Sequence, residues 1–228
     1  MAWNPVGNDT GVFIHEYQVE EYGRTNCVAV KTPKGLLILS PSQKTSPEDF
    51  EWVRAQGGVA GFVAPHGGHT LGFAEWVKQF PNCPIYTAPG SIPRIKEVTH
   101  LHARSIVEIA NLDETVRWIV PEGSKNDSLL LEVRRGARPV VYINETLADL
   151  EKQPGHNFLS RLFFKLLGLH EGFSVNRAYL RIYVKDTQTL RDETLQLLKS
   201  NPYVILAHGP VRSSAQDLQR SKELLAQI

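Results

Sequence analysis

Two histidines that flank a pair of glycines are the strongest chemical signal in this sequence. His66-Gly67-Gly68-His69 directly follows the apolar run 59–65. Imidazole is the commonest protein ligand for zinc and related metals, and the glycines let the backbone turn tightly enough for both rings to face one point. Because a zinc ion needs at least three protein ligands, the pair makes a metal site only if other donors converge on it.

The residues around this turn predict alternating strands and helices. Ser46 is a suitable N-cap for a helix with Pro47 at its first position, and Gly57-Gly58 ends that helix. A second helix is expected over 71–80, because its apolar residues have mostly helical spacing and Pro81 follows. Extended segments are expected at 12–18, 25–31, 36–40, 59–64 and 84–88. The histidine turn should therefore lie at the end of a strand, between two helices.

The second half of the chain has a similar pattern. Strands are expected at 105–109, 115–120, 129–133 and 139–143, and a last strand at 203–207 ends in His208-Gly209. Helices are expected between 146 and 200, most clearly at 158–167 and 192–200, and again from about 213. Since no linker separates the halves, we expect one domain over 1–228, with a helical insertion at about 146–200. The predicted fold class is α/β, a four-layer αββα sandwich of two mixed sheets flanked by helices.

These motifs resemble the metallo-β-lactamase fold superfamily, in a divergent branch of unknown function, and the match runs through most of the chain. The superfamily signature is His-x-His-x-Asp-His on the loop after a strand. In that register His69 falls on the last histidine and His66 on the second. Ala64 and Gly68 stand where the first histidine and the aspartate would be.

The resemblance also suggests further ligands. The loop that normally carries the next histidine corresponds to 120–128, which contains none. Glu145 takes the place of the bridging aspartate, and His208 before Gly209 matches the late-strand histidine. The implied metal ligands are thus His66, His69, Glu145 and His208. An alternative for Glu145 is an acidic residue in the first turn of a helix over 145–150, favoured there by the helix dipole.

Two functional hypotheses follow from this incomplete motif. Two or three histidines with a carboxylate and an open position form a permissible catalytic shell. The resemblance then implies a metal-dependent hydrolase-like protein holding one zinc or iron ion, with metal-bound water as nucleophile. The missing ligands equally suggest a metal-free, non-catalytic binding or scaffolding protein of the same fold. Esters, thioesters, lactones and phosphoesters would all suit the site, and the sequence does not select among them.

Composition limits the partners. The formal net charge of the 228 residues is +1, which gives no indication of nucleic acid or an anionic membrane as the main partner. The N-terminus lacks a basic segment and an apolar stretch, so we expect a cytoplasmic protein. The apolar segment 158–167 is too short to span a bilayer and is expected to pack over the mouth of the site or to form a homodimer contact, with a membrane surface as an alternative. His100 and His102 have a spacing that would place two ligands on one face of a strand, but without a third donor they are expected in an exposed loop or edge strand.

Overall fold

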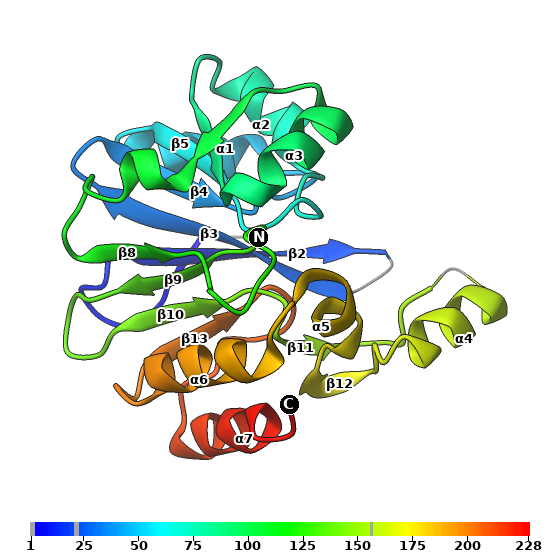
Figure 1. Cartoon of the computed structure of the whole chain (residues 1–228). Helices are drawn as coiled ribbons and strands as arrows, with labels where there is room; N and C mark the ends of the chain where they lie inside the picture. The colour runs from blue at the N-terminus through cyan, green and yellow to red at the C-terminus, as the bar shows by residue number, and fades with distance from the viewer. Residues whose placement is uncertain (1–2, 21–22, 156) are drawn as a thin grey trace.

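The computed structural model describes residues 3–20, 23–155 and 157–228. Two β-sheets pack face to face, and helices cover the outer face of each (Figure 1). The predicted α/β fold class with this αββα layering is confirmed. The first sheet contains, in spatial order, β1 (Asn4–Pro5), β2 (Val12–Val19), β3 (Gly23–Thr32), β4 (Gly35–Leu39), β5 (Val59–Ala64), β6 (Ile85–Thr87) and β7 (Ala103–Ser105).

The first sheet changes from antiparallel to parallel pairing at β4. Strands β1 to β4 pair antiparallel, and β4 to β7 pair parallel. Parallel neighbours need crossover connections, which here carry α1 (Pro47–Ala55), α2 (Phe73–Gln79) and α3 (Ile92–Thr99). The predicted cap of α1 is present, since the Ser46 side chain accepts a hydrogen bond from the backbone of Asp49. Because β4 and β5 are parallel, the residues that follow them meet at one edge of the sheet.

The second sheet brings the ends of another two strands together. Its spatial order is β13 (Tyr203–Leu206), β10 (Val140–Ile143), β9 (Leu130–Val133) and β8 (Val116–Ile119). Strands β10 and β13 pair parallel, with Ile143 opposite Leu206. Glu145 lies two residues after Ile143, and His208 lies two residues after Leu206. The register of β10 and β13 therefore places Glu145 and His208 side by side. Helices α6 (Thr187–Leu198) and α7 (Ala215–Leu225) cover the outer face of this sheet (Figure 1).

Apolar layers between the sheets and beneath the helices hold the sheets in place. Between the sheets, side chains such as Leu37 and Leu39 of the first pack with Leu131 and Tyr142 of the second. On the outer face of the first sheet, fully buried Trp76 from α2 packs with aromatic residues of the neighbouring elements. Such close-packed layers keep the strand ends in fixed positions.

The structure corrects the sequence predictions in three places. Residues 105–109 are not a strand: β7 ends at Ser105, and η2 (Ile106–Ile109) is a 3-10 turn whose N-cap is Ser105. Helix α3, preceded by the 3-10 turn η1 (Pro89–Ser91), was not expected. Glu145 does not begin a helix, because β11 (Leu147–Leu150) follows it and pairs with β12 (Gly172–Val175). The segment 146–200 therefore contains a two-stranded sheet as well as helices.

Helix α4 (Phe158–Leu166) projects from the body of the molecule, whereas α5 (Arg177–Tyr183) lies close to the sheets (Figure 1). A small cluster around Leu150 and Leu169 joins α4 to the body. Within the described residues, no helix is long and apolar enough to cross a membrane.

Candidate metal centre

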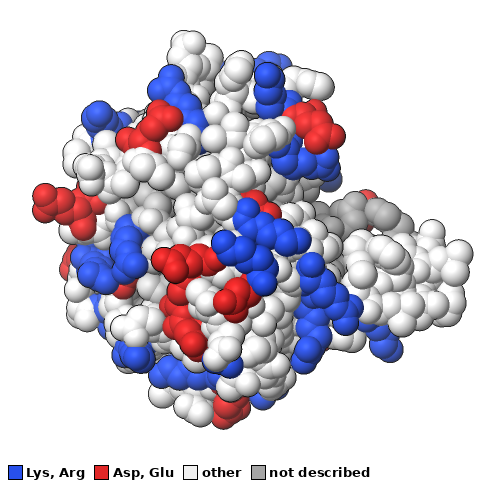
Figure 2. Space-filling view, in the orientation of Figure 1, with Lys and Arg blue, Asp and Glu red and all other residues white. Residues whose placement is uncertain are grey.

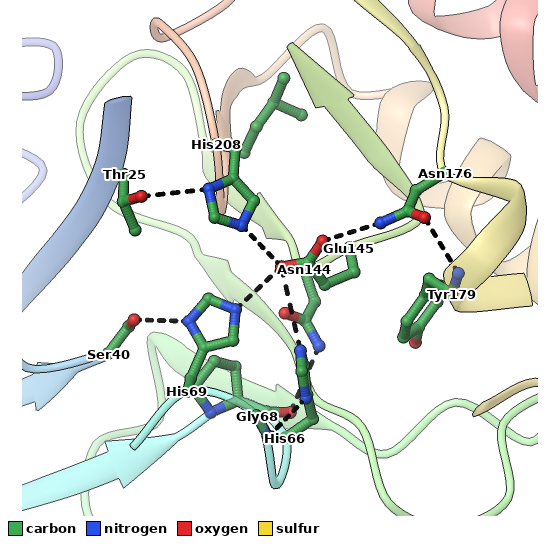
Figure 3. Close-up of polar contacts among 12 residues, drawn as sticks. Thr25, Ser40, His66, Gly68, His69, Asn144, Glu145, Asn176, Tyr179 and His208 are labelled. Carbon is green, nitrogen blue, oxygen red and sulfur yellow. Dashed lines mark hydrogen bonds and ion pairs between the residues drawn. The ribbon is translucent and has the colours of Figure 1, made fainter. Parts of the chain in front are cut away.

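Four side chains from distant parts of the sequence converge beyond the ends of β5, β10 and β13 (Figure 3). Glu145 Oε1 lies 2.9 Å from His69 Nε2 and 3.0 Å from His208 Nε2. The same oxygen lies 3.9 Å from His66 Nε2. The structure thus brings together all four residues that the sequence suggested as ligands, around a single carboxylate oxygen.

The glycine turn determines where the His66 ring lies. The backbone N–H of Gly68 donates to His66 Nδ1 over 2.9 Å, so the ring folds back over its own turn. A Cβ atom at position 68 would lie 2.6 Å from His66 Cε1. Residue 68 can therefore carry no side chain while the His66 ring keeps this position. The glycine at position 68 and the orientation of the His66 ring therefore depend on each other.

Two hydroxyl groups orient the other two histidines. Ser40 Oγ lies 2.6 Å from His69 Nδ1, and Thr25 Oγ1 lies 3.1 Å from His208 Nδ1 (Figure 3). A hydroxyl can either donate or accept a hydrogen bond. Each ring can therefore carry its proton on Nε2, facing Glu145, or on Nδ1, facing the hydroxyl. The second arrangement leaves both Nε2 atoms free to bind a cation.

Asn176 holds the other oxygen of the carboxylate. Its Nδ2 donates to Glu145 Oε2 over 2.9 Å, while its Oδ1 accepts the backbone N–H of Tyr179 as the N-cap of α5. The amide is thus fixed from both ends. Because the donor occupies Oε2, Oε1 is the oxygen that faces the histidines.

The protonation states of Glu145 and His69 suit cation binding, whereas that of His208 opposes it. Burial by itself would raise the pKa of Glu145, but the neighbouring His208 and the hydrogen bonds from the imidazoles hold that pKa well below its usual range. Burial lowers the pKa of His69 to about 4. Burial also opposes the charged form of His208, yet Glu145 outweighs it and the pKa of His208 is raised. At neutral pH an ionised carboxylate therefore faces a neutral imidazole on His69.

The donor set fits one metal ion. His66, His69 and Glu145 each offer one donor atom, and these three atoms lie within 4.8 Å of one another. In the described part of the chain, this is the group of three or more histidine, cysteine or acidic residues that could hold a metal ion. Zinc at about 2.0–2.1 Å from each ligand would put neighbouring donor atoms roughly 3.4 Å apart, so the more distant of these atoms would have to move closer, and His208 lies outside this group. Buried His66 Nε2 has no hydrogen-bond partner among the described residues.

His66 fits less easily than the other histidines. Its Nδ1 accepts the N–H of Gly68, so the proton of the neutral ring is on Nε2. To bind a metal through Nε2 the ring must give up that hydrogen bond. His69 needs only to move its proton to the nitrogen that faces Ser40, whereas His208, whose pKa is raised, must lose a proton before Nε2 can bind a cation.

The four residues lie in a cavity of about 240 Å³. Leu71 and Ile182 line it and are about half exposed, which places them where it opens to the surface. The rest of the wall is also largely apolar, and its apolar members are Val19, Pro41, Leu150, Phe164, Leu167, Leu169 and Ala178. The cavity therefore combines a charged floor with apolar walls.

The other histidine pair takes no part in this site. His100 ends α3 in the left-handed conformation, and both it and His102 are exposed. They lie in a loop before β7, as expected. Sequence reasoning missed Ser40, Thr25 and Asn176. Ser40 could have been found, because it follows a strand parallel and adjacent to the one that ends in the histidine turn.

Comparison with known proteins supports the fold. Neither the protein families nor the curated proteins compared with the sequence match it. Solved structures match over nearly the whole chain. The metallo-β-lactamase DIM-1 has a TM-score of 0.63 at 14% identity, covering 99% of this chain and 96% of its own. A metallo-β-lactamase from Hirschia baltica has 0.63 at 13% identity, covering 98% and 96%.

A third match is the metallo-β-lactamase FIM-1 from Pseudomonas aeruginosa in its mono-zinc form, with a TM-score of 0.61 at 14% identity, covering 99% of this chain and 94% of its own. Identities this low establish the architecture and leave the activity open. Layer order, site position and these neighbours agree with the resemblance seen in the sequence. The chain has the metallo-β-lactamase fold.

Proposed function

We propose that this protein is a metal-dependent hydrolase-like protein with a mononuclear zinc or iron site and a metal-bound water as nucleophile. The ligands would be His69, Glu145 and His208, with His66 as a fourth, weaker ligand. One observation carries the proposal: His69 Nε2 and His208 Nε2 lie 2.9 and 3.0 Å from the same oxygen of Glu145. Each ring also has a hydroxyl at its other nitrogen, as metal-binding histidines generally have a hydrogen-bond partner there.

The chain's own residues would divide the work as follows. His69, His208 and Glu145 hold the ion, and Ser40 and Asn176 keep two of these ligands oriented. A bound ion lowers the pKa of its water toward 7 and polarises the bond to be cleaved. At position 68 the superfamily has an aspartate that orients this water, and here the glycine cannot do so. Catalysis should consequently be slower than in an enzyme with the complete motif.

The cavity suggests the kind of substrate. Its floor is polar and its walls are largely apolar, which suits an amphiphilic molecule whose ester, thioester or phosphoester group reaches the ligands. The apolar part would lie along Leu150, Phe164 and Leu167. A strongly charged substrate would leave its charges unpaired against these walls.

A second candidate function is a metal-free binding protein. The hydrogen bonds of Glu145 to two imidazoles and to Asn176 form a satisfied network without an ion. The Gly68 N–H bond to His66 also favours the ring proton that excludes a metal at Nε2. In this alternative the same cavity would bind an amphiphile without cleaving it.

Metal analysis separates the two candidates. Protein purified without added metal, then incubated with zinc, manganese or iron and desalted, should hold about one equivalent of ion if the four residues form the site. Less than about a tenth of an equivalent of every metal would refute the metal-dependent function. The matched control is His100→Ala, which removes an exposed histidine from another part of the chain and should leave the metal content unchanged.

A further inference from the structure

Helix α4 exposes an unusual apolar surface. Five of the nine exposed large hydrophobic side chains in the described residues belong to this one helix. They are Phe158, Leu159, Leu162, Phe163 and Leu166, with exposed fractions from 42% to 78%. Their spacing of i, i+1, i+4, i+5 and i+8 places them on one face. This surface, which we call the α4 face, is covered by nothing in the described structure.

The opposite side of α4 attaches to the body. Phe164 and Leu167 pack against a small cluster that includes Leu150 and Leu169. Both also line the cavity of the candidate metal centre. The helix thus has its apolar α4 face outward and contributes a wall of the cavity on its other side. A partner that covers the α4 face would therefore lie next to the mouth of that cavity.

The charges around α4 are mostly basic, although exposed Glu151 and Glu171 flank the segment 152–170 that contains the helix. Residues 152–170 include Lys152, Arg161 and Lys165 and contain no acidic residue. Exposed Arg181 lies at the C-terminal end of the helix, where its Nη1 donates to the Leu166 carbonyl over 3.1 Å. Figure 2 shows the projecting lobe over α4 as largely uncharged, with basic side chains where it joins the body. An apolar face bordered by lysine and arginine is typical of helices that lie in a membrane interface.

We infer that the α4 face docks on an anionic lipid surface, with its apolar side chains among the acyl chains and its cations at the headgroups. The helix would lie in the plane of the interface, since it is too short to span it. A second copy of the chain is the less favourable occupant, because pairing two α4 faces would bring their bordering cations together. Docking would leave the cavity mouth at the lipid surface.

Vesicle co-sedimentation of the full-length protein tests this inference. Vesicles of phosphatidylcholine mixed with phosphatidylglycerol should bind the protein, and added salt should weaken that binding. The double variant Leu159→Glu/Phe163→Glu should bind at least about tenfold more weakly, because two large side chains lose their burial in lipid. Arg161→Gln and Lys165→Gln should each weaken binding about fivefold.

A matched control is Val107→Glu, which puts the same charge on a side chain that is 66% exposed on η2, outside α4. It should bind like the unmodified protein. Three results would overturn the inference. The protein could bind pure phosphatidylcholine vesicles equally well, or it could bind neither vesicle. The control could also lose as much vesicle affinity as the double variant. A dimer in sedimentation velocity that the double variant dissociates would overturn it as well, if vesicles are not bound. Vesicle binding needs no metal, so this outcome and that of the metal analysis are independent.

Discussion

Removing each candidate ligand separately tests the site most directly. Structural zinc sites with four ligands bind with about 10–16 kcal/mol, or roughly 3 kcal/mol per ligand. His69→Ala or His208→Ala should therefore weaken zinc binding by more than about a hundredfold. To bind zinc, the His66 ring must first give up its hydrogen bond from the Gly68 N–H. This reduces its contribution to the binding free energy by about 1 kcal/mol. His66→Ala should consequently weaken binding by only about thirtyfold.

The measurement is the zinc dissociation constant of each variant, obtained by competition with a chelating indicator. His100→Ala serves as the unaffected control, and circular dichroism verifies that each variant is folded. The expected order of loss places His69→Ala and His208→Ala above His66→Ala. If His66→Ala loses as much affinity as the other two, giving up the Gly68 hydrogen bond costs the His66 ring no binding free energy. In that case the tautomer argument from the Nδ1 contact is wrong.

Three further substitutions test the surroundings of the ligands. Ser40→Ala removes the hydroxyl at His69 Nδ1 and should weaken zinc binding about 10–100-fold in the same competition assay, while the thermal unfolding midpoint stays nearly unchanged. Asn176→Asp keeps the helix cap but replaces the donor to Glu145 by a carboxylate, so urea unfolding of the metal-free protein should show a loss of about 1–3 kcal/mol. Gly68→Asp should not restore the superfamily motif: its Cβ would clash with the His66 ring, and urea unfolding should show a loss of about 1–3 kcal/mol.

The positions of most strands along the chain could be predicted, because local hydrophobic patterns and turn residues determine them. The β5 strand was predicted with its observed bounds, and the cap and proline at 46–47 correctly marked the start of α1. Helix α3 was missed. Strand β11 was also missed, since Glu145 to Leu150 has a helix-compatible sequence. Its extended form depends on pairing with β12 and on the Asp149 N–H bond to the His208 carbonyl.

The four candidate ligands could be suggested from the sequence, but the groups that orient them could not. His66, His69, Glu145 and His208 follow strands or stand in recognisable motif positions, so each leaves a local signal. Thr25 approaches His208 from 183 residues away, and no spacing predicts that contact. Asn176 likewise carries an ordinary helix-cap signal, which gives no hint that its other end binds a buried carboxylate.

The glycine at position 68 accounts for the position of the His66 ring in this site. With glycine there, the His66 ring occupies the space that a side chain would fill, and the backbone N–H that the turn exposes is satisfied by the ring. An aspartate would need both a displaced ring and a new partner for that N–H. The glycine at position 68 and the position of the His66 ring are therefore coupled. A side chain at position 68 would displace the ring, and replacing His66 would leave the Gly68 N–H without its acceptor.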